Sequence, residues 1–98
     1  MKQARLLAKI KQYMEKIVEE DLGYLHDKKN ALSQNEWLPF FSNYKEDFTK
    51  NGNLLFGILI ESNNLNNQLS KDDVRNISNI STNKTLNEIN RKLNPGLN

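Results

Sequence analysis

The sequence contains no cysteine, and this absence excludes several classes of protein at once. A disulfide framework, a thiolate metal site and a cysteine nucleophile are all ruled out. The lack of disulfides fits a reducing compartment. The single histidine, His26, stands beside Asp27, but the remaining ligands of a zinc site and the nucleophile of a catalytic triad are not recognisable. We interpret His26 as a surface or helix-end residue.

Long apolar segments are also missing. The longest run, Leu54–Ile60, is interrupted by Gly57 and is far shorter than the roughly 18 residues of a membrane-spanning helix. The basic start of the chain is not followed by a continuous apolar stretch, which argues against a signal peptide. We expect a cytoplasmic protein, either free or bound peripherally at the inner membrane face.

Motifs that would indicate catalysis are scarce as well. Gly52, Gly57 and Gly96 match neither of the phosphate-binding glycine patterns. The carboxylate clusters at 19–21 and 72–73 fall at expected helix ends, where negative charge suits capping and the helix dipole better than acid–base chemistry. With no nucleophile–base pair in view, we predict a non-enzymatic protein that needs no cofactor or metal.

The 98 residues suit a single domain, 1–98, with a modest core. The net charge of +2 says little about the partner, but the positive charge is unevenly placed. From position 75 onward the chain has a single acidic residue, Glu88, and four basic ones: Arg75, Lys84, Arg91 and Lys92. Neither end carries the polybasic tract that is typical of a nucleic-acid-binding tail.

In the first half of the chain, apolar residues at helical spacing predict two helices. The first covers about 2–20, with Gly23 as a plausible break. Before the second, Ser33 has Glu36 at capping-box spacing, but Pro39 is comfortable only in a first helical turn. Either a short turn occupies 33–38, or the second helix starts near Pro39. The pair at 51–52, Asn-Gly, is expected to end it.

The second half continues the same pattern. Another apolar stripe covers 54–65. Ser70 with Asp73, and then Thr85 with Glu88, have the spacing of helix N-caps. No segment alternates with the period of two that is typical of strands.

These segments predict an all-α fold, a small antiparallel four-helix bundle with one or two short extra helices. The tail over 94–98 contains Pro95-Gly96 and is expected to be irregular. The apolar stripes supply the expected core: Leu6, Ile10, Ile17, Phe41, Tyr44, Phe48, Leu55, Leu59, Val74 and Ile77.

Most aromatic residues lie between positions 37 and 48. Their helical spacing favours core packing, and the alternative is an aromatic patch that binds a partner. Trp37 precedes Pro39 and falls off the main stripe, so we expect Trp37 to face outward.

The sequence also suggests two modes of binding other than protein recognition. The basic face of the first helix suits an anionic membrane surface or phosphates, but Glu15, Glu19 and Glu20 dilute it, which favours a solvated face. Residues 74–93 have roughly the apolar spacing of a DNA-binding helix-turn-helix. The turn over 79–83 lacks the usual glycine, however, and the second helix is poor in arginine.

We therefore predict a protein partner, with a membrane-embedded receptor complex as one candidate and nucleic acid as the less favoured one. The contact surface is expected between Leu69 and Leu97, because this stretch is basic and rich in serine and asparagine. The residues expected to bind the partner are Arg75, Lys84, Arg91, Lys92, Leu97 and, from the aromatic run, Trp37.

The run from Leu54 to Ile80 joins an apolar helix, a polar stretch and a capped amphipathic helix that begins at Ser70. It resembles the third and fourth helices of the immunity proteins for pediocin-like (class IIa) bacteriocins. The resemblance implies a basic, cysteine-free cytosolic four-helix bundle from a Gram-positive bacterium. It also implies recognition of the bacteriocin bound to a membrane transporter, with specificity set by the C-terminal half.

The alternative is a phage- or plasmid-encoded helical regulator or interaction module, including a DNA-binding one that uses 74–93. Sixteen asparagines and abundant lysine suggest an AT-rich genome, which suits either source. The sequence does not set the oligomeric state.

Overall fold

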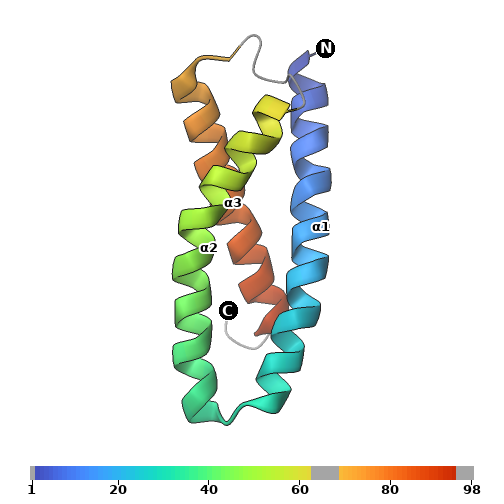
Figure 1. Ribbon diagram of the computed structural model, residues 1–98. Helices are drawn as coiled ribbons and strands as arrows, with labels where there is room; N and C mark the ends of the chain where they lie inside the picture. Colours follow the sequence, from blue (N-terminus) through green and yellow to red (C-terminus); the bar gives the residue numbers. More distant parts are fainter. Residues whose placement is uncertain (1, 63–68, 95–98) are drawn as a thin grey trace.

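The computed structural model describes residues 2–62 and 69–94, and these residues form three α-helices. The helices α1 and α2 form a long hairpin, and α3 crosses behind it (Figure 1). Their bounds are α1 Lys2–Ala31, α2 Gln34–Ser62 and α3 Lys71–Leu93. The predicted all-α bundle is confirmed, but the predicted four helices, with one or two short extra ones, are wrong.

The number of helices was overestimated because three local stop signals are overridden by packing. Gly23 lies inside α1, between Leu22 and Leu25, and both of these leucines pack into the core. Gly52 lies inside α2 and is buried against α3. Thr85 is not a cap, because it lies inside α3, where its hydroxyl donates to the carbonyl oxygen of Ser81 at 2.7 Å. The turn expected over 79–83 is therefore absent, and α3 is continuous where a helix-turn-helix would need a break.

The predicted helix start at Ser70 is confirmed, whereas α2 starts directly after Ser33 and neither a separate turn over 33–38 nor a start near Pro39 is present. The backbone N–H of Glu36 donates to Ser33 Oγ at 3.3 Å, and the Glu36 carboxylate accepts from the N–H of Ser33 at 3.1 Å. Ser70 and Asp73 form the same reciprocal pair at the start of α3. These bonds satisfy N–H groups that have no partner inside the helix.

The core consists of two apolar clusters, one toward each end of the hairpin. Between them α2 crosses α3, where Gly52 packs on Thr82. The cluster at the hairpin end comprises Val18, Leu25, Trp37, Phe41, Ile89 and Leu93. The cluster at the open end comprises Leu6, Ile10, Phe56 and Ile60.

The expected core is confirmed for Leu6, Ile10 and Phe41, which are buried. The expectation that Leu55 belongs to the core is wrong, because Leu55 is 41% exposed on α2. The other expected core residues are half-buried against the two clusters: Ile17, Tyr44, Phe48, Leu59, Val74 and Ile77.

The expectation that Trp37 faces outward is also wrong. Trp37 is only 6% exposed, and its ring stacks on Phe41 with centroids 5.2 Å apart. The reason is that α2 begins at Gln34 and includes Pro39, which places Trp37 one helical turn before Phe41 on the same face.

Candidate functional site

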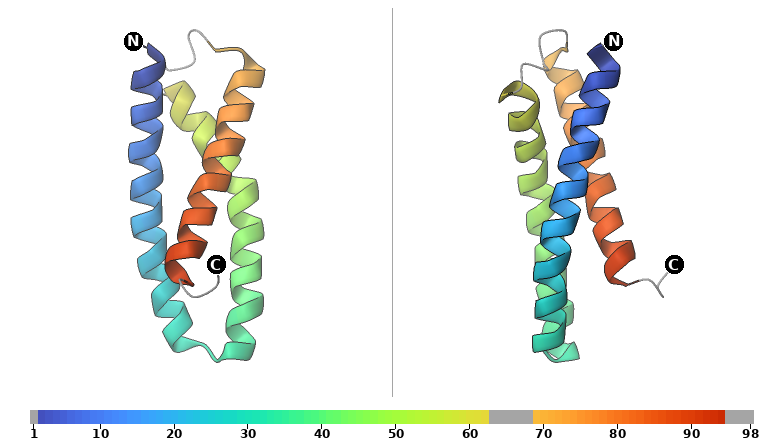
Figure 2. Two further views of the ribbon diagram at one scale, coloured as in Figure 1. Left: turned by 180° about the vertical axis from the view of Figure 1, so that it is seen from behind. Right: turned by 90° about the vertical axis from the view of Figure 1, so that its right-hand side faces the viewer.

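A groove of about 900 Å³ runs between α1 and α3. Its described lining residues belong to these two helices alone, which stand side by side in the left view of Figure 2. The α1 side contributes Lys11, Met14, Glu15, Val18, Glu19 and Leu22, and the α3 side contributes Lys84, Thr85, Asn87, Glu88, Arg91 and Lys92.

The floor of the groove is apolar. Met14, Val18 and Leu22 follow one another at intervals of four residues, so they form a single stripe along α1. Val18 is buried, and the other two are half-buried. Thr85 closes the floor on the α3 side and is fully buried. The apolar surface that the floor leaves to a ligand therefore comes from the half-buried Met14 and Leu22.

Charged side chains line both rims, and the two walls differ in sign. The α3 wall carries three cations and one carboxylate, whereas the α1 wall carries one cation, Lys11, and two carboxylates, Glu15 and Glu19. Among the residues that the structure describes, every ion pair lies within one helix, so none joins the two walls.

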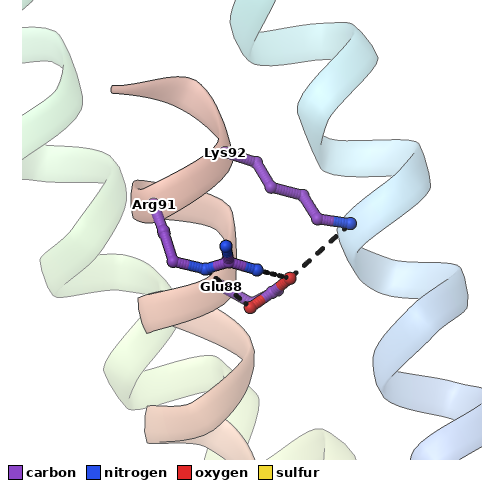
Figure 3. A network of polar contacts seen from close by, with 3 residues as sticks. All are labelled: Glu88, Arg91 and Lys92. Atoms are coloured by element: carbon purple, nitrogen blue, oxygen red, sulfur yellow. Dashed lines mark hydrogen bonds and ion pairs between the residues drawn. The ribbon is translucent and has the colours of Figure 1, made fainter. Parts of the chain in front are cut away.

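One network of polar contacts organises the α3 wall (Figure 3). Two nitrogens of the Arg91 guanidinium contact the two carboxylate oxygens of Glu88, Nη2 at 2.5 Å and Nε at 3.3 Å. Lys92 Nζ lies 3.6 Å from Glu88 Oε1, and its side chain reaches toward α1. The hydrogen bond from Arg91 holds the pKa of Glu88 below its usual range, so Glu88 is ionised at neutral pH.

This network adds little to stability, because its side chains are 37–60% exposed and water screens the pairs. Its effect is geometric. Glu88 holds Arg91 and Lys92 on the same rim as Lys84, which lies one turn earlier on α3. The α3 wall therefore presents an ordered positive edge beside the apolar floor.

The structure brings together three of the six residues predicted to bind a partner. Lys84, Arg91 and Lys92 all line the groove. Arg75 does not; it lies in a separate hollow of about 420 Å³ between α2 and α3, with a guanidinium nitrogen 4.0 Å from Asp72. Trp37 is in the core, and Leu97 lies outside the described residues.

The sequence did not lead us to predict the α1 wall of the groove. Glu15 and Glu19 were interpreted as acids that dilute a basic face, and neither Met14 nor Val18 was predicted to line a site. The spacing of Met14, Val18 and Leu22 marks a stripe, but the sequence does not show that α3 leaves this stripe partly open.

Other polar features of the described chain carry no comparable site. Tyr44 donates a hydrogen bond to Asp21, and burial raises the pKa of Tyr44 above its ordinary value, with this bond as the smaller cause. In residues 2–62 and 69–94, no three histidine or acidic side chains gather to hold a metal ion. None of the described helices combines the length and apolar character needed to cross a membrane.

No protein-family model, curated protein or solved structure matches the chain. The functional inference therefore depends on the chemistry of the groove.

Proposed function

We propose that this chain is a non-enzymatic protein-binding protein and that the α1–α3 groove is its contact surface. The observation that carries the proposal is the groove between α1 and α3, where the half-buried Met14 and Leu22 lie between two charged rims. An apolar centre with a polar rim is the usual composition of a protein–protein contact. Arginine, present here as Arg91, is enriched among the residues that dominate binding energy.

The charges of the groove favour a protein over a nucleic acid. Glu15 and Glu19 stand on the α1 wall, where they would repel a phosphate backbone that approached the cations of α3. A protein surface can present both signs of charge at once and so complement both walls.

Bacteriocin immunity is the more specific form of the proposal. It is supported by the resemblance of residues 54–80 to the pediocin-like immunity proteins, although the described residues form three helices and not the four of that family. In that family the C-terminal half sets specificity, and here α3 supplies the basic wall of the groove. Expression in a sensitive Gram-positive strain should protect it against one or a few class IIa bacteriocins. Unchanged sensitivity across a panel of such bacteriocins would refute this form and leave protein binding to be tested separately.

Site-specific photo-crosslinking in the native host tests the general proposal. A photoreactive benzoylphenylalanine replaces Asn87 on the groove rim, and in a matched variant it replaces Asn43 on α2; both positions are exposed. We expect a discrete adduct from position 87 and none from position 43. An adduct from position 43 alone, or none from position 87, would contradict the groove as the contact surface.

A further inference from the structure

The C-terminal half of α2 is apolar on every side, yet only one of its sides is covered. Six of the seven residues at 54–60 are leucine, isoleucine or phenylalanine. A helical segment that is apolar all round is usually buried on all sides. Phe56 and Ile60 are fully buried against the rest of the bundle, whereas Leu54 is 66% exposed and Ile58 is 52% exposed. Exposed apolar residues that adjoin one another in this way mark an interaction surface.

The exposed residues belong to one face of α2. Lys50, Leu54, Ile58 and Glu61 follow one another at intervals of four, four and three residues, so they share a side of the helix, which we call the outer face. Phe56 is two residues from both Leu54 and Ile58 and so points to the opposite side. In the right view of Figure 2, this end of α2 stands at the edge of the bundle, with α1 and α3 on one side of it. None of the four outer-face residues lines the α1–α3 groove, so a partner on this face is independent of the proposed function.

The charges of the outer face complement one another when two copies meet. The face begins with a basic residue, Lys50, and ends with an acidic one, Glu61, and the apolar pair lies between them. We infer that a second copy of this chain covers the outer face, with the two α2 helices antiparallel about a two-fold axis. Leu54 then lies opposite Ile58 of the partner subunit, Lys50 lies opposite Glu61 of the partner subunit, and the symmetry repeats each contact. A parallel pair would instead place each charge against its own copy.

Neither charged side chain of the outer face is held by a strong contact within the chain. Lys50 Nζ lies 3.6 Å from Glu46 Oε1, and the two side chains are 72% and 66% exposed, so water screens the pair. Glu61 takes part in none of the ion pairs between the residues that the structure describes, although Lys71 and Arg75 line the same hollow between α2 and α3. Both outer-face charges can therefore turn toward a partner subunit.

The size of the outer face predicts a weak dimer. The large apolar side chains that it offers are Leu54, Ile58 and, on its flank, Leu55, which is 41% exposed. Three such side chains and their charged ends fall short of the roughly 800 Å² per partner that is typical of a stable interface. We therefore expect a monomer–dimer equilibrium with a dissociation constant of about 10–500 μM.

Sedimentation equilibrium tests this self-association, because the molecule is elongated, 48 × 23 × 20 Å, and the method reports mass independently of shape. Between about 10 μM and about 1 mM, the average mass should rise from the 11.4 kDa of the monomer toward twice that value. Leu54→Glu should weaken association about tenfold or more. The matched control is Leu38→Glu, because Leu38 is 61% exposed near the other end of α2, beyond the overlap of the two helices. It should leave the dissociation constant within about twofold of the wild-type value, with circular dichroism showing that both variants fold.

Charge reversal tests the direction of the two helices. Lys50→Glu or Glu61→Lys alone should weaken association about threefold or more, because each places like charges together twice. The double variant Lys50→Glu/Glu61→Lys exchanges the two charges and should regain the wild-type dissociation constant. A monomer at about 1 mM, or a Leu54→Glu variant that associates as tightly as Leu38→Glu, would overturn the inference. So would single reversals without effect, or a double variant that stays as weak as the single ones.

Discussion

Replacing Gly52 by alanine perturbs the point where α2 and α3 cross. A Cβ atom at this position would lie 2.7 Å from Cγ2 and 3.1 Å from Oγ1 of Thr82, and 3.4 Å from Cε1 of Phe48. Thr82 is 1% exposed, and its hydroxyl donates to the carbonyl oxygen of Ser78 at 2.7 Å. The threonine therefore has little room to move, and overpacking of this kind costs about 1–3 kcal/mol.

The same substitution at Gly23 provides the matched control, because nothing lies within 4 Å of a Cβ there. Alanine is the better helix former by roughly 0.5–1 kcal/mol, so Gly23→Ala should raise the free energy of unfolding by about that amount. Gly52→Ala receives the same gain but bears the clash, so it should be less stable than Gly23→Ala by about 1–3 kcal/mol.

Urea unfolding followed by circular dichroism at 222 nm measures both variants, with the slope m expected to stay constant. Adding Thr82→Ser, which removes the methyl group nearest the new Cβ, should return much of the loss in Gly52→Ala. If Gly52→Ala and Gly23→Ala were stabilised equally, α2 and α3 would not approach each other at Gly52, and the crossing described above would be refuted.

Three further results are expected. Phe56→Ala should lower the free energy of unfolding by about 3–5 kcal/mol, because Phe56 is fully buried. In the same urea assay Leu54→Ala should cost less than about 1 kcal/mol, because Leu54 is 66% exposed. Equal losses in the two variants would contradict the placement of the core. Ser70→Ala removes the capping box of α3 and should cost about 0.5–2 kcal/mol, and no loss in thermal unfolding would argue against the cap. The pKa of Tyr44 is raised in the folded protein. The stability that the protonated Tyr44 hydroxyl contributes is therefore complete below the ordinary tyrosine pKa near 10, and this stability is lost as the pH rises above that value. Tyr44→Phe should weaken that alkaline loss, and an identical pH profile would show that Tyr44 is not its source.

The sequence was informative wherever a feature depends on neighbours along the chain. The capping boxes at Ser33 and Ser70 need only a side chain and a backbone group three residues apart, and both are present. The helix ends expected at Gly23, at 51–52 and at Thr85 are absent. At these places packing against another helix determines that the helix continues. Gly52 does not end α2; it allows α2 to approach α3 closely.

In the candidate site, too, features that depend on one helix were predictable and features that depend on the packing of two helices were not. The positive edge was predictable, because Lys84, Arg91 and Lys92 recur on one face of a single helix. The opposing wall depends on how α1 lies beside α3, which no local pattern encodes. Trp37 was misplaced for a related reason: the proline that follows it was expected to interrupt the helix, and α2 continues through it.

The most direct test of the groove as the contact surface compares two cations of α3 in binding to the partner captured by crosslinking. Lys84 lines the groove, and Arg75 lies outside it, so Lys84→Glu and Arg75→Glu make the same change of charge on the same helix. The dissociation constant is measured for each variant by isothermal titration calorimetry, after circular dichroism has shown that both variants fold. The groove account predicts that Lys84→Glu weakens binding about tenfold or more and that Arg75→Glu leaves it within about twofold. An equal loss in both variants, or a loss confined to Arg75→Glu, would contradict it.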